Sequence, residues 1–249
     1  MAALAIAGLP HLPLAGAAAD VSAVIVALAP VVASMVAAAR ARPGTRVLLP
    51  LLVASLLGLV AVGVAGLQPW LVPLQAGCLV AAGYAVGSIV GARVQFAGHM
   101  LPAAAVAAAA DVASVLSPEG PSNAALSSEK ALSVLALAGP VPGTHAFTFV
   151  LGVGDLVFVA LALRVAVEHG ASLRRVTLGV AAGLVVAFAS SALSGVAIPA
   201  LVPLGIAVVV ATPEFRRVRK RERTLTAVSV AASIAVIGGV LVRAALAAR

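Results

Sequence analysis

Two carboxylic acids lie inside strongly apolar runs of this chain. Of its 8 Asp and Glu residues, only Asp111 and Asp155 fall within such runs. A carboxylate is costly to place at membrane depth, so an acid there marks a functional site by default. Two acids that meet share a proton, so that the ionised acid can activate water while the protonated acid polarises a carbonyl group. The pair is a candidate for peptide hydrolysis, for a proton relay, or for a hydrogen-bonded link between two helices.

Three motifs in a fixed order surround the two acids. After Asp111 the chain reads D-x-x-x-V-L-x-P-x-G-P. A GxGD tetrapeptide and a Pro-Ala-Leu tripeptide follow, made by Gly152, Val153, Gly154 and Asp155 and by Pro199, Ala200 and Leu201. This set resembles the presenilin family of GxGD intramembrane aspartyl proteases, which includes the signal peptide peptidases. The resemblance covers about residues 97–212, and the stretch after Asp111 is more similar to presenilin than to signal peptide peptidase.

The resemblance implies a specific function and site. Asp111 and Asp155 would form the catalytic dyad of an intramembrane aspartyl endopeptidase that cleaves transmembrane segments or signal peptides. The glycines of the GxGD motif, Val153 and the Pro-Ala-Leu residues would support the active site and the substrate. The implied partners are these peptide substrates and membrane lipid, with no nucleic acid, metal or other cofactor.

The chain departs from the presenilin pattern in several respects. Ala110 stands where the family usually has a tyrosine, which affects substrate-pocket packing rather than the acid chemistry. Three helices are predicted before the Asp111 helix where presenilins have five. The loop between the two acid-bearing helices has only about 25 residues, and an additional helix over 224–247 follows the Pro-Ala-Leu region.

Other functions remain open from the residues alone. A prepilin-peptidase-like GxGD protease typically has a lysine soon after the motif, whereas Leu156, Val157 and Phe158 follow here. A proton-coupled transporter or a structural membrane protein would use the acid pair without catalysis. A metalloprotease fits poorly, because the chain has no HExxH motif and its four histidines lack ligand spacing.

Composition predicts the scaffold that positions these residues. Hydrophobic residues make up 63% of the 249 positions, charged residues 10%, and the mean hydropathy is +1.19. These values exclude a soluble globular domain and a disordered chain. At roughly 20 residues per crossing, the continuous apolar runs predict an all-α polytopic transmembrane bundle of about eight helices, presenilin-like in its motifs. The runs cover about residues 20–39, 47–67, 71–92, 97–117, 144–164, 176–195, 197–212 and 224–247.

Prolines and glycines predict local features of these helices. Pro199 and Pro203 should break the helix over 197–212 and free backbone carbonyls for an unwound substrate segment. Glycines spaced four apart should let helix backbones approach closely inside the monomer. They are Gly83, Gly87 and Gly91 in one run and Gly179 and Gly183 in another.

The motifs divide the chain into four parts. Residues 1–117 would hold the N-terminal helices and end with the first acid, and 118–143 form a polar loop. Residues 144–212 would hold the GxGD helix, one intervening helix and the Pro-Ala-Leu segment. Residues 213–249 would form a basic loop and the C-terminal helix.

The basic residues predict how the bundle is oriented. The net charge is +8, and of the 16 Lys and Arg residues only Lys130, Arg243 and Arg249 lie outside four alternate loops. The positive-inside rule places those four loops in the cytoplasm, with both termini and the 118–143 loop outside. Residues 1–19 have no basic n-region and are expected to be interfacial or re-entrant. The frequent Ala and the preference for Arg over Lys favour a prokaryotic cytoplasmic membrane.

Overall fold

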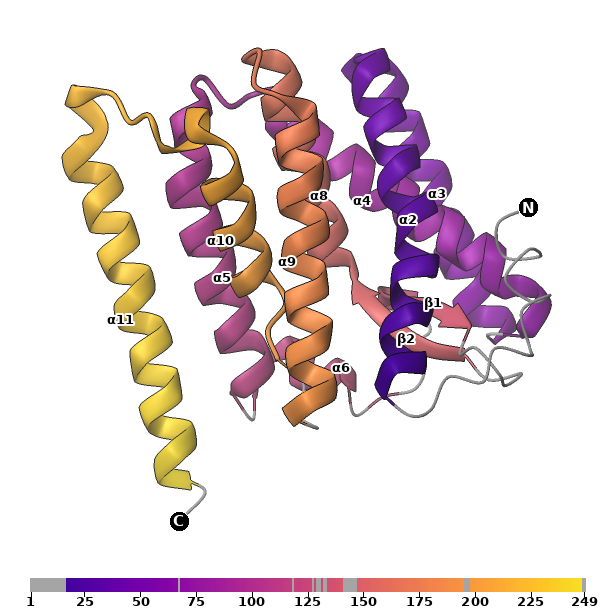
Figure 1. Cartoon of the computed structure of the whole chain (residues 1–249). Coiled ribbons are helices and arrows are strands. Elements are labelled where there is room, and N and C mark those ends of the chain that lie inside the picture. Colours follow the sequence, from indigo (N-terminus) through magenta and orange to yellow (C-terminus); the bar gives the residue numbers. More distant parts are fainter. Residues whose placement is uncertain are drawn as a thin grey trace.

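The chain folds into a bundle of helices with one small β-hairpin. The computed structural model describes residues 17–66, 68–117, 119–126, 128, 131, 134–140, 147–194 and 198–247. Figure 1 shows the long helices running side by side, with the hairpin at one end of the bundle. The helices are α2 (Ala17–Ala41), α3 (Thr45–Ala65), α4 (Val72–Gly91), α5 (Met100–Leu116), α6 (Pro121–Leu126), α8 (Val153–Glu168), α9 (Leu173–Ser194), α10 (Leu201–Ala211) and α11 (Arg223–Ala247). The two antiparallel strands are β1 (Ala136–Pro140) and β2 (Phe147–Gly152), and single 3-10 turns are η1 (Pro69–Leu71), η2 (Ala97–His99), η3 (Pro213–Arg216) and η4 (Lys220–Glu222).

Several helices have the length and composition of membrane spans. Within the described residues, five segments are long and apolar enough to cross a membrane: Thr45–Ala65, Val72–Gly91, Ala97–Leu116, Leu173–Ser191 and Lys220–Ala244. Most large side chains exposed on α3 and α11 are Leu, Val or Ile, as expected for helices that face lipid. The prediction of an all-α membrane bundle is confirmed at this level.

Two of the predicted helices begin later than expected. The start predicted for the helix over 144–164 was wrong. Residues 147–152 form β2, and the helix begins at Val153. The segment Phe147–Gly152 is rich in aromatic and β-branched residues and ends in a glycine, which favours a short strand. The helix predicted over 197–212 begins at Leu201. Of the expected interfacial segment 1–19, residues 17–19 belong to α2 and the remainder lie outside the described residues.

Glycines let α4 pack directly against α8. A Cβ atom at Gly83 would lie 2.7 Å from Cβ of Leu156, and one at Gly91 would lie 2.8 Å from Cβ of Arg164. At Gly87 a Cβ would contact the carbonyl oxygen of Val157. The predicted close packing inside the monomer is therefore confirmed, and α4 fixes the position of the helix that carries Asp155.

Glycines also let α9 pack directly against α10. A Cβ atom at Gly179 would lie 2.9 Å from Cα of Val208, and one at Gly183 would lie against Leu204. Helix α10 also packs against α5, where a Cβ at Gly205 would lie 3.4 Å from Cβ of Ala104. Helix α11 covers α5 on the other side (Figure 1). The helices that hold Asp111 and the Pro-Ala-Leu segment are thus in direct contact.

The connections between the helices alternate between two ends of the bundle. The turns that join α2 to α3, α4 to α5, α8 to α9 and α10 to α11 all lie at the end opposite the hairpin (Figure 1). The four arginine-containing loops of the sequence belong to these turns. The bundle therefore has one basic end, and a second end that holds the hairpin and α6.

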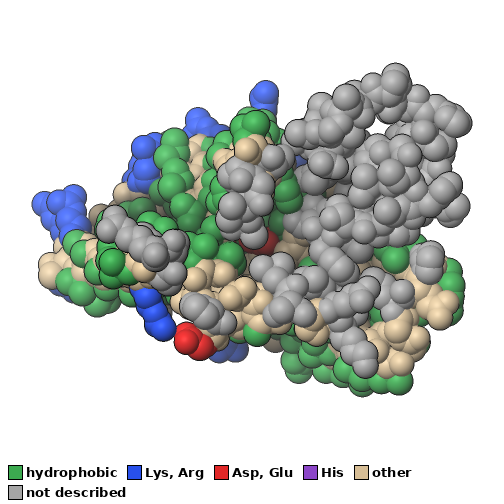
Figure 2. Space-filling model, turned by 90° about the horizontal axis from the view of Figure 1, so that it is seen from below, with side chains coloured by type: hydrophobic (Ala, Val, Ile, Leu, Met, Phe, Trp, Pro, Cys, Tyr) green, Lys and Arg blue, Asp and Glu red, His purple; other side chains and the backbone are tan. Residues whose placement is uncertain are grey.

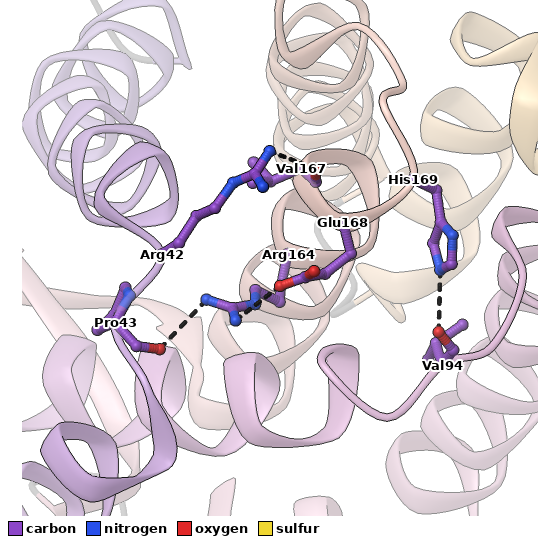
Figure 3. A network of polar contacts seen from close by, with 7 residues as sticks. All are labelled: Arg42, Pro43, Val94, Arg164, Val167, Glu168 and His169. Atoms are coloured by element: carbon purple, nitrogen blue, oxygen red, sulfur yellow. Dashed lines mark hydrogen bonds and ion pairs between the residues drawn. The ribbon is translucent and has the colours of Figure 1, made fainter.

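A network of polar contacts closes the basic end of α8 (Figure 3). The guanidinium of Arg42 donates to the carbonyl oxygen of Val167 at 2.9 Å, which satisfies a carbonyl of the last helical turn. Arg164, which is 8% exposed, donates to the carbonyl oxygen of Pro43 at 3.3 Å and forms an ion pair of 2.7 Å with Glu168. The α2–α3 turn and the end of α8 thus hold each other in place.

The α4–α5 connection is anchored at the same end. Nε2 of His169, which follows α8, lies 2.9 Å from the carbonyl oxygen of Val94. Nε2 of His99 lies 3.2 Å from a carboxylate oxygen of Glu222 in η4. The helix of Asp111 is therefore tied, through the connection before it, to the end of the helix of Asp155.

Candidate active site

Asp111 accepts a hydrogen bond from the Pro-Ala-Leu segment. It lies near the C-terminal end of α5 and is partly exposed. The backbone N–H of Leu201 donates to its Oδ2 at 2.9 Å, across 90 positions of sequence. Leu201 is the first residue of α10, so its N–H has no intrahelical partner and carries the positive end of the helix dipole. The arrangement stabilises negative charge on Asp111.

The prolines explain why the N–H of Leu201 has no partner within its own helix. Pro199 is buried, and the residue before a proline is disfavoured in helical conformation, so the helix does not extend through Ile198. Ala200 caps α10, and Pro203 lies in its first turn, where a missing N–H costs no intrahelical bond. The predicted break within the helix is not observed at Pro203, because α10 is continuous from Leu201 to Ala211; Pro199 lies before its start, and the group directed at Asp111 is a backbone donor rather than a freed carbonyl.

Asp155 lies in the first turn of α8 and is 9% exposed. The N–H of Gly152, the N-cap residue, donates to its Oδ2 at 3.1 Å. A side chain at the third helical position that reaches back to the N-cap N–H is half of a capping box. The dipole of α8 also favours negative charge at this position. Local helix capping therefore sets the orientation of the Asp155 carboxylate.

The glycines of the GxGD motif do not have a packing role in the described structure. A Cβ atom at Gly154, which is exposed, would have no atom within 4 Å, and one at Gly152 would lie 3.5 Å from Oδ2 of Asp155. Val153, the residue between them, is half-buried. Their positions contrast with the tightly packed glycines of α4, and they leave the approach to Asp155 open along the backbone.

The two acids lie within reach of each other's charge. Helices α5 and α8 are in contact, and the Asp111 and Asp155 carboxylates interact electrostatically. Each carboxylate uses Oδ2 to accept a backbone N–H. Figure 2 shows the hairpin end of the molecule, where a small acidic area is visible near the centre beside hydrophobic side chains and residues that are not described. The arrangement suits an acid pair that shares a proton and meets a ligand from this end.

Two features beside the acids were not predicted from the sequence. The first is the β-hairpin, in which Ala136 at the start of β1 pairs with Gly152 at the end of β2. The second is Gln75 of α4, whose Nε2 donates to the carbonyl oxygen of Ala136 at 2.6 Å. A signal for Gln75 was present, since it is a polar residue inside the apolar run 71–92.

The remaining polar residues do not add a metal ligand set. Within the described residues, no group of three or more His, Cys, Asp or Glu side chains could hold a metal ion. His145, just before the GxGD motif, lies outside the described residues. Among the described residues, the groups that meet at the site are two carboxyl groups, two backbone N–H donors and an adjacent strand.

Comparison with known proteins gives no independent family assignment. No family model matches the chain, and neither a curated protein nor a solved structure matches it. The resemblance to presenilins and signal peptide peptidases consequently depends on the three sequence motifs.

Proposed function

We propose that this protein is an intramembrane aspartyl endopeptidase of the GxGD type, with Asp111 and Asp155 as its catalytic pair. The observation that carries the proposal is the hydrogen bond from Leu201 to Asp111, together with the direct contact between α5 and α8, the two helices that carry the acids. Three motifs that are far apart in sequence thereby converge on one site. A mere helix–helix link would not require a helix N-terminus to be directed at one of the acids.

The proposed reaction needs one proton shared between the two acids. The ionised carboxylate removes a proton from a water molecule, whose oxygen attacks the scissile carbonyl carbon. The protonated carboxyl group donates its hydrogen bond to the carbonyl oxygen, which becomes a hydroxyl in the tetrahedral intermediate. Collapse of that intermediate breaks the C–N bond, and the amine leaves with a proton from the pair. The N–H groups of Leu201 and Gly152 stabilise whichever acid is ionised.

The substrate is proposed to bind in extended form. A helical transmembrane segment buries its peptide bonds in its own hydrogen bonds, so cleavage requires local unwinding. Strand β2 leads directly into Gly152 and the first turn of α8. A substrate strand that added to this edge would bring its peptide bonds past the open backbone at Gly154 and toward Asp155.

A cleavage assay tests this function. Purified protein in detergent micelles is incubated with a synthetic transmembrane peptide, and the products are identified by mass spectrometry. Asp111→Asn and Asp155→Asn should each abolish cleavage, because a dyad fails when either acid cannot ionise or share the proton. The control is Glu119→Gln, which alters an acid that is 74% exposed in the loop after α5. Wild-type turnover in either aspartate variant would refute the catalytic assignment.

A further inference from the structure

Gln75 is a fully buried polar residue that connects two distant parts of the fold. It lies in the first turn of α4 and is 0% exposed. Its Nε2 donates to the carbonyl oxygen of Ala136, 61 positions away, at 2.6 Å. Burial of a carboxamide is costly unless it is hydrogen-bonded, so this contact offsets a substantial penalty.

Arg164 is also buried and bridges two elements, but it does so at the basic end, where it joins α8 to the α2–α3 turn. The buried serines of the helices do not bridge elements. The hydroxyl groups of Ser55 and Ser233 each donate to a carbonyl oxygen four positions earlier in the same helix. Ser88, which is buried on the same helix as Gln75, has no hydrogen-bond partner among the described residues. Gln75 is distinct because its partner is the first residue of a strand.

A short series of contacts leads from Gln75 to Asp155. Ala136 pairs with Gly152 in the hairpin register. The N–H of Gly152 donates to Oδ2 of Asp155 at 3.1 Å. Helix α4 also contacts α8 through Gly83, at the residue that follows Asp155. One helix therefore fixes both the strand pair and the helix that meet at this carboxylate.

We propose that Gln75 is a positioning residue of the active site. Its carboxamide holds β1 against α4, which keeps β2 extended and keeps the N–H of Gly152 directed at Asp155. The catalytic consequence depends on the proposed protease function, whereas the hold on the hairpin does not. The side chain acts through the hairpin, and its Oε1 has no hydrogen-bond partner among the described residues. The Nε2 contact therefore offsets only part of the cost of burying this carboxamide.

The test compares Gln75→Met with Ser88→Ala. Methionine fills a similar volume but cannot donate to Ala136, and Ser88→Ala removes another buried polar group from the same helix. We expect Gln75→Met to lower kcat for a transmembrane peptide by about ten-fold or more, with a smaller change in KM. Amide hydrogen exchange in peptides that cover 136–152 should become faster. Ser88→Ala should leave both readouts at the wild-type level.

Gln75→Glu gives a readout that simple loss of packing would not reproduce. A glutamic acid can donate to the carbonyl oxygen of Ala136 only when it is protonated. Relative to wild type at the same pH, hairpin protection and kcat of Gln75→Glu should therefore recover as the pH falls. Gln75→Met has no such group and should show no recovery.

The possible outcomes separate this inference from the protease function. Wild-type exchange of the hairpin in Gln75→Met would overturn the positioning role. Faster exchange with unchanged kcat would overturn it as well, because the hairpin would then be irrelevant to the reaction. If the wild-type protein cleaves no peptide while Gln75→Met still loosens the hairpin, the protease function fails and the hold on the hairpin stands.

Discussion

Replacement of Pro199 by alanine should remove most of the activity without destabilising the protein. The N–H of Leu201 is available to Asp111, at 2.9 Å, because α10 does not extend further toward the N-terminus. Pro199 enforces this by keeping Ile198 out of helical conformation. With alanine at this position, α10 can gain residues at its start, and the N–H of Leu201 then turns to an intrahelical carbonyl group.

The expected magnitude follows from the hydrogen bond that would be lost. A hydrogen bond to a charged group contributes about 1.5–3 kcal/mol net. If that stabilisation is missing in the transition state, kcat falls about 10- to 150-fold, at about 1.36 kcal/mol per factor of ten. Pro→Ala also adds freedom to the unfolded chain, at a cost of about 0.4–1 kcal/mol, which the additional helical hydrogen bonds offset. The free energy of unfolding should therefore be unchanged or higher.

The assay measures initial cleavage rates and the melting temperature of the same detergent-solubilised preparations. Pro102→Ala is the matched control, because Pro102 lies in the first turn of α5, far along that helix from Asp111. It should retain wild-type cleavage. Full activity in Pro199→Ala would refute the reasoning and reduce this proline to a packing kink, and a large fall in melting temperature would show that its role is structural.

Three further predictions concern packing and orientation. Gly87→Ala should destabilise the protein by about 1–3 kcal/mol, because its Cβ would meet the backbone of α8, whereas Gly77→Ala, where a Cβ meets open space, should leave the melting temperature unchanged or slightly higher, because alanine is the better helix former. Arg164→Met should lower stability by about 1–3 kcal/mol, since it removes the buried contacts at the basic end of α8, and a wild-type melting temperature would contradict this. In a Cys78→Ala background, Glu119→Cys should react with an impermeant thiol reagent in intact cells, and labelling only after lysis would reverse the predicted orientation.

The helices could be predicted from the sequence because of what a membrane requires. Backbone groups in lipid must be satisfied within their own segment, so long apolar runs form helices whatever their detailed composition. The hairpin could not be predicted in the same way. The stretch Phe147–Gly152 is a short apolar run, and a continuous apolar run of that length has no periodicity that distinguishes a strand from the start of a helix.

The sequence predicted some residues of the candidate site better than others. Asp111 and Asp155 stood out because acids are rare in apolar runs, and their catalytic role remains a prediction. The donor at Leu201 was not predictable, because a backbone N–H becomes available only where a helix begins, and its partner lies in another helix. Gln75 was visible as a polar residue, but its partner, Ala136, is a residue without any polar side chain.

The depth of the acids and the charge of the loops together restrict which substrates the proposed protease can accept. Asp155 lies in the first turn of α8, and Asp111 lies about 9 Å from Ser117 at 1.5 Å per residue, so both acids are near the hairpin end. The arginine-containing turns lie at the opposite end, which the positive-inside rule assigns to the cytoplasm. A segment with a cytoplasmic N-terminus, as in a signal peptide, would present its C-terminal turns at this depth. Those turns are close to the membrane surface and unwind most readily, so we expect cleavage near the outer ends of such segments.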